Sequence, residues 1–154
     1  HPNPSRLERA PFARAPGAVF VTLRNPDESL RGCIGELAAH RALIDSVRGC
    51  AAGAALRDPR FSPVRPDEIA GLHIGISVLM PSTPSDPASV EVGRHGVIIE
   101  HGEHRGVLLP EVAVDQGWTR EELLAGVCRK AGLPLDAWRD PEAQIRVFET
   151  RKYE

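Results

Sequence analysis

The six residues Leu-Arg-Gly-Cys-Ile-Gly at positions 30–35 constrain the fold more than any other stretch of the chain. The run is strand-like, and successive side chains of a strand point to opposite faces of a sheet. Arg31 and Cys33 therefore share one face, while Gly32 and Ile34 share the other. The sequence thus predicts that a guanidinium and a thiol face the same way.

Strands and one helix are predicted around this run. Residues 18–23, Ala-Val-Phe-Val-Thr-Leu, are rich in β-branched and aromatic residues with little alternation, which is typical of a strand covered on both faces. The sequence Asn-Pro-Asp-Glu at 25–28 favours a turn, so the two strands are expected to lie side by side. Between 39 and 56, apolar and small residues recur at helical spacing, and Asp58 before a proline ends that helix.

The rest of the chain carries further strand and helix signals. Strands are predicted from alternating or β-rich patterns at 72–79, 97–101, 104–109 and 144–150. A proline-rich loop at 81–87 is expected to lack regular structure. Thr119 and Glu122 form a capping box at the start of a helix predicted over 119–131.

Length and composition are those of one globular unit. The 154 residues are close to the usual size of a domain. Residues 1–17 are rich in proline, so we expect an extended N-terminal arm that docks through Leu7 and Phe12, and we expect a single domain over 18–154. No run approaches the roughly 18 apolar residues that a membrane helix needs, so no membrane insertion is expected.

Charge and cysteine usage bear on partners and on the compartment. The formal net charge is -2, and the basic residues are dispersed among acidic ones, so no nucleic acid partner is expected. Cys33, Cys50 and Cys128 show no metal-ligand spacing, and no signal-peptide pattern precedes them. A reducing cytoplasm is the expected location.

Several motifs of the chain, in the same order, are those of one known family. They are Leu30–Gly35, Asp58–Phe61, Ile76–Leu79, Arg105–Ala113 and Lys130–Pro134. Independent motifs in one order make a chance match remote. The chain therefore resembles the AMMECR domain family over residues 18–148.

The resemblance carries expectations about fold and partners. It implies an α+β fold of largely antiparallel sheet flanked by helices, in two unequal lobes with a groove between them and the 30–35 motif near that groove. For bacterial members it also implies two partners, a Memo-like protein and a radical S-adenosylmethionine (radical SAM) protein, and there the domain is called AmmeMemoRadiSam system protein A. No established reaction comes with the family, so a cofactor stays unknown.

Cys33 is the first candidate for chemistry. The Arg31 guanidinium could stabilise its thiolate, because a nearby positive charge lowers the pKa of a thiol from about 8.5. Gly32 and Gly35 would let a ligand come close, and Arg60 is expected to line the same ligand site. The alternative is that Cys33 is a small core residue and that the glycines permit a helix to pack tightly on the sheet.

Histidines are the candidates for a base or a metal ligand. His40 follows the motif and is the candidate base for a cysteine nucleophile, although a surface or capping role is the alternative. His101 and His104 would face each other across a hairpin, but two ligands at an exposed tip are too few for a tight site, so no metal site is expected.

The sequence leaves two functions open. In the first, the domain binds a small molecule or a modified side chain in a groove lined by Arg31, Cys33 and Arg60, with thiol chemistry at Cys33 as an enzyme or an accessory subunit. In the second, it is a non-catalytic interaction module whose motifs hold the fold while its surface docks the Memo-like or radical SAM partner.

Overall fold

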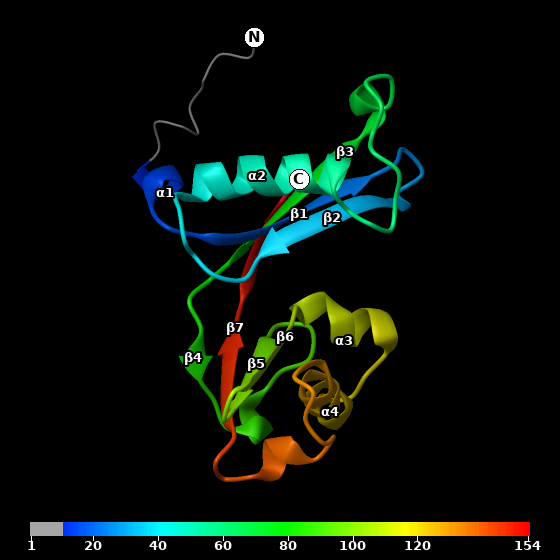
Figure 1. Cartoon of the computed structure of the whole chain (residues 1–154). Coiled ribbons are helices and arrows are strands. Elements are labelled where there is room, and N and C mark those ends of the chain that lie inside the picture. Colours follow the sequence, from blue (N-terminus) through cyan, green and yellow to red (C-terminus); the bar gives the residue numbers. More distant parts are fainter. Residues whose placement is uncertain (1–10) are drawn as a thin grey trace. The chain divides into compact units, whose positions relative to one another are not determined.

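The computed structural model describes residues 11–154, which divide into two compact units (Figure 1). One unit comprises the chain as far as Leu79 together with Arg151–Glu154, and the other is Met80–Thr150. Each unit is built around a four-stranded sheet. The predicted α+β class with antiparallel sheet is thereby confirmed.

The sheet of the first unit has the strand order β2-β1-β3-β8. Its strands are β1 (Ala18–Arg24), β2 (Leu30–Glu36), β3 (His73–Leu79) and β8 (Thr150–Tyr153). The central strand β1 pairs antiparallel with both β2 and β3. The glycine-bracketed motif therefore forms an edge strand, and one side of its backbone is available for contacts outside the sheet.

Helix α2 (Leu43–Leu56) packs on one face of this sheet. Val19 and Val21 of β1 are fully buried there with Cys50 and Ala54 of the helix. Because side chains alternate along a strand, the intervening residues of β1 point to the opposite face. The face that carries Cys33 is consequently the one that α2 leaves uncovered.

The N-terminal arm differs from the prediction in its described part. Pro11–Arg14 forms one turn of helix, α1, because proline at a first helical position already has the required backbone angle. Pro16 then forms an isolated bridge with Ala42, and the Leu43 N–H donates to the Ala15 carbonyl at 2.9 Å. The expected docking through Leu7 and Phe12 involves side chains that lie outside the described part of the structure.

The second unit has the strand order β4-β7-β5-β6. Its elements are β4 (Thr83–Pro84), β5 (Gly96–His101), β6 (His104–Leu108), α3 (Pro110–Gln116), α4 (Arg120–Lys130) and β7 (Gln144–Phe148). Helix α4 buries Leu123, Leu124 and Val127 against Val97 and Ile99 of β5. Short 3-10 turns occur at Ile69–Gly71, Pro87–Ser89 and Ala137–Arg139.

In this unit, the predicted hairpin and the predicted helix capping box are both confirmed. The expected β5–β6 hairpin forms with His101 opposite His104, and Glu100 lies opposite Arg105. The capping box of α4 is complete, with the Thr119 hydroxyl accepting from the Glu122 N–H and the Glu122 carboxylate accepting from the Thr119 N–H.

Two segments correct the prediction. Thr83–Pro84 lies in the proline-rich loop but forms β4, which pairs with β7 at the sheet edge, the position where a strand tolerates proline. The single strand predicted over 144–150 is interrupted at Glu149, so β7 and β8 belong to different sheets. No helix in the described part of the chain is long and apolar enough to cross a membrane.

Candidate functional site

Cys33 lies in the edge strand β2, paired with Thr22 of β1. Its Sγ is 3.3 Å from the Thr22 Oγ1, and its side chain is partly exposed. Cys50 and Cys128 are buried, and burial raises the pKa of both thiols. Of the cysteines, all within the described residues, Cys33 is therefore the one that a ligand or a reagent can reach in the folded state.

The guanidinium of Arg31 is committed to other groups. Its Nε and Nη2 donate to the two carboxylate oxygens of Glu68 at 2.9 and 3.2 Å, and its Nη1 donates to the Ser62 carbonyl at 2.9 Å. Arg31 is buried, and its hydrogen bonds lower the pKa of the Glu68 carboxyl. Arg31 thus ties β2 to the segment that follows α2.

Arg60 pairs with Asp58. The Arg60 Nε and Nη2 donate to the Asp58 carboxylate at 3.0 and 2.7 Å, and this pairing raises the pKa of the guanidinium. A smaller electrostatic interaction with Cys33 also raises the pKa of Arg60. The Arg60 side chain is 56% exposed, so it also remains accessible to a ligand.

Asp58 connects this cation to the backbone of the motif. Its Oδ2 accepts the Cys33 N–H at 3.0 Å, on the side of β2 that no strand covers. The Arg60 hydrogen bonds, followed by that of the Cys33 N–H, hold the pKa of the Asp58 carboxyl well below its usual range. The Asp58 side chain is only 2% exposed. This carboxylate therefore stays ionised at neutral pH and fixes both neighbours.

The two glycines of the motif have packing roles. A Cβ on Gly32 would lie 2.1 Å from the Ala54 carbonyl oxygen of α2. A Cβ on Gly35 would lie 2.2 Å from the Phe20 ring of the neighbouring strand. The close approach of α2 to Gly32 and of the Phe20 ring to Gly35 therefore requires glycine at both positions. The expected contact of these glycines with a ligand stays a prediction.

His40 lies apart from the thiol. It is exposed, and its charge is among the smaller influences that lower the pKa of Glu36, the largest being the hydrogen bond from Arg41. Within the described residues no hydrogen bond joins His40 to Cys33, and the partner of the thiol is Thr22. The structure therefore does not bring the candidate base to the candidate nucleophile.

A pocket of about 410 Å³ opens beside the start of β2. Leu30, Phe61 and Pro63 contribute apolar surface to its lining, and Arg31 and Glu68 contribute their ion pair. Cys33 follows Arg31 by two residues in β2, which is about 7 Å at the usual rise of a strand. Cys33 is not among the residues that line the pocket.

Three residues of this region were not among the predicted site residues. Asp58 and Phe61 belong to a recognised motif, but its sequence gave no sign that the carboxylate accepts from Cys33. Glu68 belongs to none of the motifs described above. Asp58 contacts Cys33 across 25 residues of chain, and Glu68 contacts Arg31 across 37. The periodicity of a sequence does not reveal contacts over such separations.

Comparison with known proteins gives consistent matches over almost the whole chain. A family model described as AMMECR1 matches residues 1–153. A protein of Thermococcus gammatolerans is 43% identical over 146 residues, covering 88% of this chain and 71% of the relative. Protein MK0488 of Methanopyrus kandleri is 43% identical over 145 residues, covering 88% of this chain and 70% of that protein.

A solved structure agrees with the fold. The crystal structure of the uncharacterized protein PH0010 from Pyrococcus horikoshii matches with a TM-score of 0.81 and 37% sequence identity. The match covers 97% of this chain and 78% of that one.

Proposed function

The chain belongs to the AMMECR1 family, and from that premise we propose that it binds a small molecule or a modified side chain at the Leu30–Gly35 strand, with the thiol of Cys33 beside it. The pocket lined by Leu30 and Arg31 is the observation that carries this proposal. Its volume of about 410 Å³ falls in the range that holds small ligands, roughly 300–1,000 Å³.

The lining indicates the kind of ligand. Leu30, Phe61 and Pro63 favour an apolar body. Arg31 and Glu68 neutralise each other, so they offer polar contacts without a net charge. The exposed guanidinium of Arg60 lies next to the Phe61 ring, 5.4 Å from its centroid, and favours a negative or polarised group on the ligand.

The position of Cys33 supports thiol chemistry on the bound molecule. The thiol is partly exposed, and Arg60, whose guanidinium interacts electrostatically with it, is 56% exposed and open to the ligand. The thiolate adds to an electrophilic carbonyl or conjugated carbon of the ligand, so that the new S–C bond replaces a π bond. The electron pair of that π bond takes a proton from solvent water, and the thiol proton leaves to solvent water. His40 is not placed to accept that proton, so no side-chain base is assigned.

Selective alkylation tests the exposure and activation of the thiol. Iodoacetamide is expected to label Cys33 in the native protein while Cys50 and Cys128 stay unlabelled, because both are buried. Arg60→Gln should slow the labelling of Cys33 several-fold, because it removes a cation that interacts electrostatically with the thiol. Peptide mass spectrometry gives the rate for each cysteine.

The matched control and the ligand belong to the same experiment. Arg105→Gln removes an exposed arginine paired with Glu100, and it should leave the Cys33 rate unchanged. A small molecule that raises the melting temperature should protect Cys33 from iodoacetamide, and Phe61→Ala should abolish both effects. If Cys33 is labelled at the same rate in the wild type and in Arg60→Gln, assistance of the thiol by Arg60 is ruled out. If no stabilising compound protects it, the ligand site at the motif is ruled out.

A second candidate function is a non-catalytic interaction module that acts with Memo-like and radical SAM proteins. Ile69, in the 3-10 turn before β3, and Ile74, in β3, are 61% and 52% exposed and offer apolar surface to a docking partner. Co-purification with a Memo-like protein that survives Cys33→Ser but not Ile74→Glu distinguishes this function from ligand binding at the thiol.

A further inference from the structure

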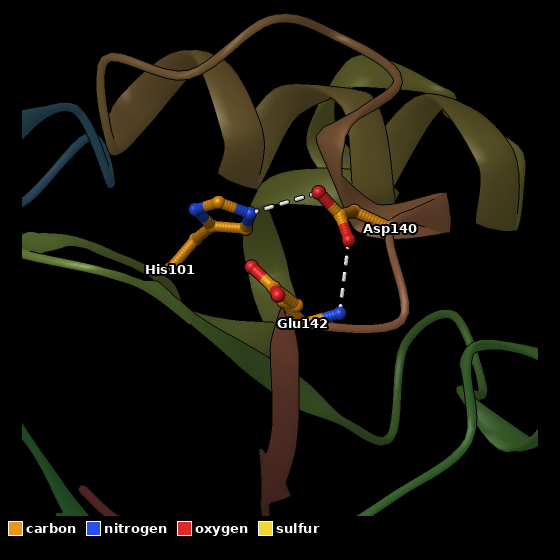
Figure 2. A group of neighbouring side chains, drawn as sticks. All are labelled: His101, Asp140 and Glu142. Carbon is orange, nitrogen blue, oxygen red and sulfur yellow. Dashed lines mark hydrogen bonds and ion pairs between the residues drawn. The ribbon is translucent and has the colours of Figure 1, made fainter.

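We propose that His101, Asp140 and Glu142 form a binding site for a divalent transition metal ion, with zinc the best match to the donors (Figure 2). One nitrogen or oxygen ligand atom of each residue lies within 4.8 Å of those of the other two. All three residues belong to the unit Met80–Thr150, so the proposal is independent of the chemistry at Cys33.

The three side chains come from two segments far apart in the sequence. His101 is the last residue of β5, while Asp140 and Glu142 flank a proline in the turn before β7. Strands β5 and β7 pair antiparallel, with Glu100 opposite Gln144. The pairing therefore brings the end of one strand to the start of the other, and the carboxylates to the imidazole.

The first two donors already have the spacing of metal ligands. The His101 Nε2 is 3.0 Å from the Asp140 Oδ2. Two ligand atoms bound to zinc at about 2.0–2.1 Å and at a tetrahedral angle are about 3.3 Å apart. A zinc ion can therefore replace the proton between these two atoms with only a small movement of the side chains.

A second hydrogen bond orients the Asp140 carboxylate. Its Oδ1 accepts the Glu142 N–H at 2.9 Å, so the other oxygen is turned toward His101 (Figure 2). These two bonds hold the Asp140 carboxylate in one orientation. Hydrogen bonds that hold ligands in place are typical of metal sites.

The carboxylate of Glu142 gives an independent indication. Among the described residues it has no hydrogen-bond or ion-pair partner, yet it is turned toward the His101 ring (Figure 2). Nor does a lysine or arginine of the described chain pair with Asp140. Two carboxylates thus face one imidazole without a compensating cation, and a divalent ion would supply that charge.

The donor set selects the class of metal. Imidazole nitrogen suits zinc, nickel and copper, whereas magnesium and calcium prefer sites made entirely of oxygen. Three protein ligands at a tetrahedral ion leave one position for water or for a further ligand. The His101 side chain is 28% exposed and that of Asp140 is 44% exposed, so the ion can enter from solvent.

Zinc titration of the full chain by calorimetry tests the site. The titration is done in the Cys33→Ser background, so that the exposed thiol cannot bind the ion. One equivalent of zinc is expected to bind. Glu142→Gln should weaken binding by roughly tenfold or more, and His101→Gln should abolish it. Cobalt(II) as a probe should give a spectrum without thiolate charge transfer.

The controls are taken from the same hairpin. Glu103→Gln removes an exposed carboxylate at its turn, and His104→Gln removes an imidazole whose Nδ1 is 3.1 Å from the Ala131 carbonyl oxygen. Both controls should bind zinc like the parent. The proposal would be overturned if the parent does not bind zinc. It would also be overturned if Glu142→Gln and His101→Gln bind zinc with the affinity of the parent.

Discussion

Replacement of Gly32 with alanine is expected to destabilise the protein by about 3 kcal/mol, at the upper end of the usual cost of overpacking. The new Cβ would lie 2.1 Å from the Ala54 carbonyl oxygen and 3.0 Å from its carbon. These are backbone atoms of α2, so no side-chain rotation relieves the clash. The helix would have to move away from β1, exposing Val19 and Val21. Urea unfolding followed by circular dichroism measures the loss.

Gly75→Ala is the matched control for this prediction. Gly75 lies in the same sheet, opposite Thr22, but a Cβ there would be 3.9 Å from the nearest atom, the Thr22 carbonyl oxygen. Alanine should be tolerated or slightly stabilising, since it reduces the conformational freedom of the unfolded chain. Equal destabilisation by the two substitutions would mean that the helix is not held by close contact at Gly32.

The elements that could be predicted from sequence are those whose signals lie within a few residues. Thr119 and Glu122 satisfy each other within one helical turn, and the hairpin around Gly102 sets its own register. The strand at 30–35 was predicted because alternation needs no distant partner. Local hydrogen bonds and periodicity decide such elements regardless of the rest of the fold.

The site could be predicted only in part, because its charges pair across long stretches of chain. The sequence placed Arg31 near Cys33 but could not show that Glu68 engages the guanidinium. It pointed to Arg60 as a ligand-site residue, yet the connection through Asp58 appears only in three dimensions. The cluster at His101 was missed for the same reason, since its carboxylates lie about forty residues away.

Asp58→Asn is expected to loosen the motif strand at Cys33. Both carboxylate oxygens of Asp58 accept from N–H donors: Oδ1 from Arg60, and Oδ2 from Arg60 and Cys33. An amide in either orientation would turn an NH₂ group toward these donors. Hydrogen exchange of the Cys33 amide should accelerate, and the urea midpoint at pH 7 should fall. Asp67→Asn, in an exposed pair with Arg65, is the control and should change little.

The same substitution should remove part of the acid sensitivity of the fold. The pKa of Asp58 is lowered in the folded state, chiefly by Arg60 and then by the Cys33 N–H, so its contribution is full above the unfolded value of about 3.9. As the pH falls below about 4 toward the lower folded pKa, the unfolded state binds the proton first and this contribution is lost. The urea midpoint of the wild type should therefore drop more steeply below pH 4 than that of Asp58→Asn. Parallel curves would show that Asp58 does not hold Cys33 and Arg60 through its charge.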